Sequence, residues 1–136
     1  MAWQLFDFYD LRGRNVTSDW LLSLDRVMRA RMKSKLQSIR TFGGTGLPGM
    51  VTDTREPHIK EIVVNGQLAL RLFLCRGPID VRAQITLLGG GRERDSRYVT
   101  KKPHITPEDA ETYRQQLFAD PRSRRKPHEF SEDDLG

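Results

Sequence analysis

Polar and apolar residues alternate along residues 67–75 and 81–87, as they do in β-strands that bury one face. In the first segment every even-numbered position from 68 to 74 is a leucine, so this side is predicted to lie in the core. The opposite side carries Arg71 and Phe73 and is predicted to be open. In the second segment the predicted core side consists of Val81, Ala83, Ile85 and Leu87. Its predicted open side consists of Arg82, Gln84 and Thr86.

A further strand is predicted at residues 58–64, joined to the next by Asn65-Gly66. Asn-Gly between apolar runs favours a two-residue hairpin turn, which would place Lys60 opposite Arg71. Two directly opposed cations repel each other, so such a pair indicates either a bound anion or side chains splayed into water. The same register puts Glu61 on the core side. We therefore expect this strand to be frayed, bulged or at an edge.

The two following strands are predicted to be joined by a four-residue loop at residues 76–79, because this length matches their apolar faces. That register would place Arg71 beside Gln84 and Phe73 beside Arg82. Gly89-Gly90-Gly91 lacks the Gly-Lys-Ser/Thr sequence of a phosphate loop. These glycines favour a bend or a close approach of another segment.

Residues 3–8 are predicted to form an aromatic strand, and Thr17 or Ser18 to cap a helix that starts near Asp19. Its apolar residues recur every three or four positions: Leu21, Leu24, Met28, Met32, Leu36 and Ile39. Asp25 is predicted to divide it into a short and a longer helix. Its basic residues form either a solvated face or a phosphate contact. Phe42-Gly43-Gly44 should end it.

Thr106-Pro107-Glu108-Asp109 predicts the start of another helix, with a capping Thr, Pro in the first turn and acids after it. This helix should end near Phe118. Residues 121–136 contain few apolar side chains, and we expect a flexible, charged tail there. The predicted organisation is therefore one domain over residues 1–120 and a tail over residues 121–136. The predicted fold class is α+β, with a small, twisted, mostly antiparallel sheet.

The 136-residue chain has 23 Lys and Arg against 18 Asp and Glu, a net charge of +5 and a pI near 9.7. The charges of residues 121–136 cancel, so the excess lies in residues 1–120. It favours an anionic partner, nucleic acid first; a soluble basic protein without such a partner is the alternative. The single cysteine, Cys75, excludes an internal disulfide, fits a reducing compartment and is read as a packing residue.

No apolar run approaches the ~18 residues of a membrane-spanning helix. The N-terminus MAWQLFDFYD lacks the basic start of a signal peptide. We therefore expect a cytoplasmic protein with no membrane partner. No cluster of His, Cys and carboxylates has metal-ligand spacing, and no Ser-His-Asp set is indicated, so neither a metal nor a cofactor is expected.

The order of these elements resembles the RelE/ParE/HigB superfamily of bacterial toxins from toxin–antitoxin pairs. The segment WLLSLDRVMRARMKSKLQSIRTFG is similar to the family's helical hairpin, and HIKEIVV-NG-QLALRLFL to its Lys-bearing strand, turn and Arg-bearing strand. ITLLGGGRERDSRYV is similar to the last strand and Arg-Glu-Arg…Tyr end of the RelE branch. KKPHITPEDAETYRQQL resembles a helix of the HigB branch. The resemblance covers residues 3–118 and implies a helical hairpin on one sheet face and a C-terminal helix.

The resemblance implies a ribosome-dependent endoribonuclease that cleaves mRNA without metal and is held in check by a cognate antitoxin protein. By motif, the catalytic residues would be Lys60, Arg71, Arg92 and Tyr98. Gly91 stands where a Lys often precedes the Arg, and either Tyr98 or His104 lies nearest the phosphate; Lys101 is a further proton-transfer candidate. Phe73 would stack on a base. The complete predicted RNA-binding set is His58, Phe73, Arg82, Gln84, Arg94, Arg97, Lys101, Lys102 and His104.

Two other functions stay open. The ParE branch shares the fold and poisons DNA gyrase through protein contacts. A phage or mobile-element relative could have lost the active site. The Arg-Glu-Arg…Tyr sequence and the predicted Lys60–Arg71 pair favour the nuclease.

Overall fold

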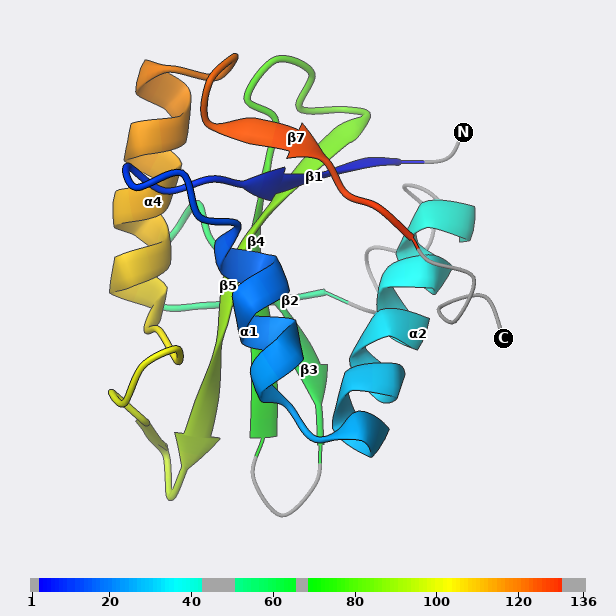
Figure 1. Ribbon diagram of the computed structural model, residues 1–136, viewed down its shortest axis with the longest axis vertical. Coiled ribbons are helices and arrows are strands. Elements are labelled where there is room, and N and C mark those ends of the chain that lie inside the picture. The colour runs from blue at the N-terminus through cyan, green and yellow to red at the C-terminus, as the bar shows by residue number, and fades with distance from the viewer. Residues whose placement is uncertain (1–2, 43–50, 66–68, 131–136) are drawn as a thin grey trace.

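A computed structural model describes residues 3–42, 51–65 and 69–130 of the chain (Figure 1). The fold is α+β, as predicted. Its helices are α1 (Val16–Ser23), α2 (Arg26–Phe42) and α4 (Pro107–Ala119). Its strands are β1 (Gln4–Phe8), β2 (Thr52–Asp53), β3 (Lys60–Val64), β4 (Ala69–Arg76), β5 (Gln84–Arg94), β6 (Arg97–Tyr98) and β7 (Arg125–Pro127). None of the described helices is both long and apolar enough to cross a membrane.

The strands form one mixed, seven-stranded sheet in the order β2-β3-β4-β5-β1-β7, with β6 paired to the end of β5. The β3-β4-β5 meander is antiparallel, as predicted. β1 lies parallel to β5, because α1 and α2 carry the chain from β1 toward the opposite edge of the sheet before the meander begins. The order of segments in the sequence is thus preserved, while the first and fifth strands become neighbours.

Both faces of the sheet are covered (Figure 1). On the α1 and α2 side, Leu70, Leu72 and Leu74 pack with Trp20 and Leu36, which confirms the predicted leucine face. Leu68 lies outside the described residues. On the α4 side, a second core contains Phe8, Ile59, Phe73, Cys75, Leu88, Ala110 and Leu117. The prediction that this second face is open was wrong, because α4 lies over it.

The predicted strand registers were also wrong. Lys60 pairs with Leu74, and Val63 pairs with Arg71, so Lys60 and Arg71 are not opposed. Val64 pairs with Leu70, which requires a longer connection than a two-residue Asn65-Gly66 turn; Gly66 itself lies outside the described residues. Moving the register by three residues transfers Glu61 from the leucine face to the α4 side.

The β4–β5 connection is likewise longer than the predicted four residues, because β5 begins at Gln84. Arg71 pairs with Gly91 instead of lying beside Gln84, and the register shifts between Leu72 and Leu74. Arg82 lies in a turn before β5, and Val81 is 52% exposed, so neither belongs to the predicted strand. Only the Ile85 and Leu87 part of that predicted apolar face is buried.

The helix boundaries follow local capping. The N-cap of α1 is Asn15 and not Thr17 or Ser18: its Oδ1 accepts a hydrogen bond from the Ser18 N–H at 3.0 Å. Asp25 separates α1 from α2, as predicted, and its Oδ1 accepts from the Met28 N–H at 2.9 Å. The capping box predicted at Thr106 is present at the start of α4.

The predicted close approach at the triple glycine is confirmed. A Cβ atom added to Gly90 would lie 2.3 Å from the Trp20 ring, and one added to Gly91 would lie 2.3 Å from the Ile105 carbonyl oxygen. β5 can therefore carry α1 on one side and the chain leading to α4 on the other. Asp95 and Ser96 both have positive φ and form the tight connection from β5 to β6.

The segment predicted as a flexible tail instead contributes a strand. Lys126 of β7 pairs with Asp7 of β1, and the His128 N–H donates to the Leu5 carbonyl oxygen at 2.9 Å. The sheet thus extends beyond residue 120. Residues 131–136 lie outside the described part of the chain.

Candidate catalytic cluster on the sheet

Four polar side chains from four strands converge on the α4 side of the sheet: Glu61 from β3, Arg71 from β4, Glu93 from β5 and Tyr98 from β6. The register brings them together, since Glu61 pairs with Phe73 and Glu93 pairs with Tyr98. Glu61 is only 4% exposed. A carboxylate this deeply buried needs charged or hydrogen-bonding partners.

Arg71 supplies the main partner. Its Nη1 donates to Glu61 Oε1 in a short ion pair. Its Nε lies 2.7 Å from Glu93 Oε2, close enough for an ion pair although the angle forms no hydrogen bond. The hydroxyl of Tyr98 donates to Glu61 Oε2 at 3.3 Å. Thus each Glu61 oxygen has a donor, and Arg71 is shared by two carboxylates.

Burial raises the pKa of Glu61 above its ordinary value, although Arg71 and the hydrogen bond from Tyr98 act in the opposite direction. Burial and the nearby Glu61 charge raise the pKa of Tyr98 to about 12. At neutral pH Tyr98 therefore keeps its proton and acts as a donor. Glu61 is the member of the pair that can accept a proton in the working range.

Arg55 covers the outer side of this cluster. Its guanidinium lies 5.2 Å from the centre of the Tyr98 ring. It also binds Glu108 of α4 through two hydrogen bonds, with Nε to Oε2 at 2.6 Å and Nη2 to Oε1 at 2.5 Å. Both side chains of this ion pair are about half exposed, at 57% and 51%. The pair links the loop before β3 to α4 across the approach to Tyr98.

A basic cleft of about 370 Å³ lies between the same loop and α4. It brings together the predicted residues His58 and Lys60 with Arg76 and Arg114. Lys60 is paired with Asp53, and Arg114 with Glu111. Its apolar lining includes Cys75, whose thiol is buried with a pKa raised to about 12. That burial confirms the reading of Cys75 as a packing residue.

Arg92 lies on the opposite face. It pairs with Leu70 of the α1-side core, whereas its neighbours Gly91 and Glu93 alternate to the α4 side. His104 is on the Arg92 side too: its Nδ1 accepts a hydrogen bond from Trp20 Nε1 at 3.1 Å. Burial, with a further contribution from Arg92, lowers the pKa of His104. The sheet therefore separates Arg92 and His104 from the Arg71–Tyr98 cluster.

The other predicted RNA-binding residues are dispersed. Phe73 is fully buried with Tyr98 beside it, so the prediction that it stacks on a base was wrong. Gln84 is at the far end of β5, where its amide donates to Gln4. Arg82 is exposed near that end. Four exposed cations follow the cluster along the chain: Arg94, Arg97, Lys101 and Lys102.

Glu61 is the residue that the sequence did not single out as functional. The signal was present, because an acid in an apolar strand was noted as a misfit. Over the described ranges, no three His, Cys, Asp or Glu side chains are placed to hold a metal ion together. Comparisons of the chain with protein-family models, curated proteins and solved structures found no match.

Proposed function

We propose that this protein is a RelE-like toxin that cleaves mRNA on the ribosome. Support for the RelE-like arrangement comes from the element order: a first strand, two helices, and a meander whose last strand lies beside the first. Support for the activity comes from a single observation. The buried Glu61 carboxylate has a raised pKa and contacts both an arginine and a tyrosine.

Cleavage of RNA by its own 2′-hydroxyl requires a base, stabilisation of a negatively charged phosphorane and protonation of the leaving oxygen. In the proposed reaction Glu61 accepts the 2′-hydroxyl proton while the 2′ oxygen bonds to phosphorus. The bond from phosphorus to the 5′ oxygen breaks, and that oxygen takes a proton from water. Arg71 stabilises the phosphorane charge, and Tyr98 holds Glu61 in place. The products are a 2′,3′-cyclic phosphate and a 5′-hydroxyl.

Substrate access requires a local opening, since Glu61 is buried in the free protein. The Arg55–Glu108 pair is exposed enough to exchange partners with a ligand. An RNA phosphate that replaces Glu108 on Arg55 would bring the backbone next to Tyr98, and the adjoining phosphates would enter the cleft at His58 and Lys60. The cognate antitoxin is proposed to cover this approach with an acidic segment.

Replacement of Glu61 by Gln tests the catalytic assignment. The purified variant and the wild type are added to a cell-free translation reaction, and mRNA ends at the ribosomal A site are mapped. We expect wild-type cleavage and a ~10²–10⁴-fold loss for Glu61→Gln, the usual worth of a positioned base. Glu56→Gln, in the loop before β3, is the matched control and should cleave normally. Equal cleavage by Glu61→Gln and the wild type would refute the assignment.

One observation favours a second candidate, a binder without nuclease activity. Arg71 already faces two carboxylates, Glu61 and Glu93, which compete with a phosphate for its charge. A ParE-like gyrase poison or an inactivated relative would tolerate this arrangement. Expression of the protein alone separates the alternatives. Growth arrest with cleaved mRNA, relieved by the neighbouring gene product, supports the nuclease; arrest with intact mRNA and gyrase trapped on broken DNA supports the poison. Normal growth at high soluble expression supports the inactivated relative.

A further inference from the structure

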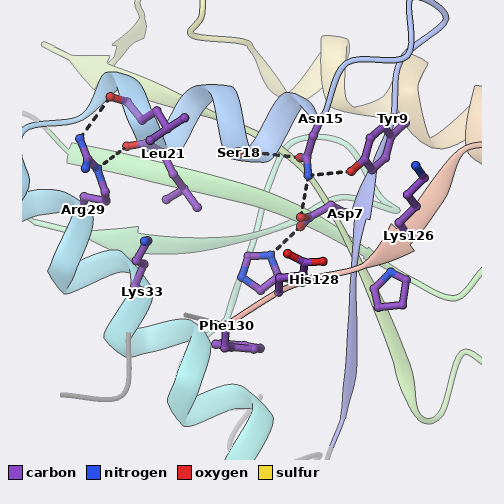
Figure 2. A pocket seen from close by; sticks show the side chains of 13 residues that line it. Asp7, Tyr9, Asn15, Ser18, Leu21, Arg29, Lys33, Lys126, His128 and Phe130 are labelled. Carbon is purple, nitrogen blue, oxygen red and sulfur yellow. Dashed lines mark hydrogen bonds and ion pairs between the residues drawn. The ribbon is translucent and has the colours of Figure 1, made fainter. Parts of the chain in front are cut away.

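A pocket of about 650 Å³ lies away from the Glu61 cluster, where β1 and β7 face α1 and α2 (Figure 2). None of the cluster residues Glu61, Arg71, Glu93 or Tyr98 lines it. Its volume falls in the range of small-molecule sites. Its walls combine an Asp–His pair, basic side chains and aromatic rings.

Asp7 and His128 form the floor of this pocket. His128 Nδ1 and Asp7 Oδ1 are 2.7 Å apart, and the two side chains are only 8% and 7% exposed. Asn15 Nδ2 donates to the other Asp7 oxygen at 2.8 Å. Asn15 is itself fixed, because its Oδ1 caps α1 through the Ser18 N–H. The orientation of the pair is therefore set by the fold.

The bond to Asp7 leaves one nitrogen of His128 without a partner. Because the Asp7 carboxylate accepts, Nδ1 must carry the hydrogen of this bond. Nε2 has no hydrogen-bond partner among the described residues. Figure 2 shows the His128 ring between Asp7 on one side and Lys33 and Phe130 on the other, so Nε2 is directed into the pocket. A buried polar atom with no partner indicates a place for a ligand atom.

The pocket's charge indicates an anion. Lys33 and Arg29 from α2 face Lys126 from β7 across it. Arg29 is occupied by backbone carbonyls, with Nε donating to the Leu21 oxygen at 3.0 Å, so it contributes field more than a free donor. Glu129 is the acid on the rim. With three cations against Asp7 and Glu129, the lining carries an excess of positive charge when His128 is neutral.

The pocket also offers aromatic surfaces. Phe130 lies edge-on to His128, with ring centres 4.8 Å apart, and Tyr9 lines the β1 side. We propose that this pocket binds a small phosphate ester of mononucleotide size, with the phosphate near Lys33 and Lys126, His128 Nε2 bonded to the ligand, and the apolar part against Phe130.

Titration calorimetry of the full chain with adenosine monophosphate, ribose 5-phosphate and adenosine tests this proposal. Both phosphate esters should bind more tightly than adenosine. The double variant Lys33→Gln, Lys126→Gln should weaken binding by about tenfold or more, since charge-assisted contacts to phosphate are lost. Arg31→Gln, an exposed cation of the same helix outside the pocket, should bind as the wild type does.

Replacement of His128 by Ala, checked for folding by circular dichroism, should also weaken binding. If this variant fails to fold, the Lys33, Lys126 pair of substitutions still decides the question. Phosphate-ester binding no tighter than that of adenosine, absence of binding at millimolar ligand, or an unchanged double variant would overturn the proposal. Glu61→Gln should retain binding, so this result is independent of the proposed nuclease.

Discussion

The Tyr98 hydroxyl donates to Oε2 of Glu61 across 3.3 Å, and this bond couples the two groups most suited to proton transfer. Because the pKa of Tyr98 is raised to about 12, Tyr98 stays protonated over the physiological range. The sequence had favoured a tyrosine whose pKa is lowered by cations. The structure instead assigns proton acceptance to Glu61 and donation to Tyr98.

The pH dependence of cleavage should follow Glu61. Burial raises the pKa of this carboxyl above 4.5, so Glu61 becomes protonated and inactive as a base when pH falls through that raised value. Single-turnover cleavage rates measured from pH 4.5 to 8 should therefore rise with pH, with a midpoint above 4.5. Glu61→Gln should lack this limb. A midpoint below 4.5 would contradict the role given to Glu61.

Tyr98→Phe should shift the same limb to higher pH. The hydrogen bond from Tyr98 lowers the pKa of Glu61, so its removal lets burial raise that pKa further. The ring remains, and its contact with Phe73, at 6.0 Å between centres, should keep the fold intact. Cleavage rates of the variant and the wild type are compared across the same pH range. A limb at unchanged pH would show that Tyr98 does not set the state of Glu61.

Gly90→Ala should destabilise the protein. The new methyl group would lie 2.3 Å from a fully buried Trp20 ring, and such overpacking typically costs about 1–3 kcal/mol or more. Thermal unfolding should show a lower Tm. Gly13→Ala is the matched control: Gly13 also has positive φ, but nothing lies within 4 Å of its added Cβ. If Gly13→Ala lowered Tm as much as Gly90→Ala, the loss could not be assigned to the contact with Trp20.

The leucine face, the helix break at Asp25 and the capping box at Thr106 were predictable because each depends on neighbouring residues. Strand pairing depends on loop length, and Asn65-Gly66 gave the wrong length. One shift in register then misplaced Glu61, which pairs with Phe73 instead of lying opposite Leu70. The cluster around Arg71 could not be found without the correct register.

The role of the C-terminal segment was hidden for a different reason. β7 contains Arg125, Lys126 and Pro127, which have no strand pattern of their own. Its position comes from pairing with β1 and from the contact of His128 with Asp7. Such a strand is specified by its partners, so composition alone indicated a tail. The predicted α4 boundaries, by contrast, needed only local signals.

Arg71 and Arg92 should differ in their effect on cleavage. They were predicted to act together, but the sheet places Arg71 with Glu61 and Arg92 with His104 on the other face. Arg71→Ala should reduce cleavage ~10²–10³-fold, as expected for loss of one preorganised charge contact. Arg92→Ala should leave the cleavage step within a few-fold of the wild type.

Salt dependence distinguishes binding from catalysis in these two variants. Ribosome or RNA affinity should fall steeply with salt for the wild type, because phosphate contacts release counterions. If Arg92 serves only as a phosphate contact, Arg92→Ala should flatten this dependence while single-turnover cleavage at saturation stays near that of the wild type. Arg71→Ala should lower the saturated rate itself. Equal losses of the saturated rate in both variants would contradict the separation of the two faces, and salt-independent binding by the wild type would remove the phosphate contacts on which the nuclease proposal depends.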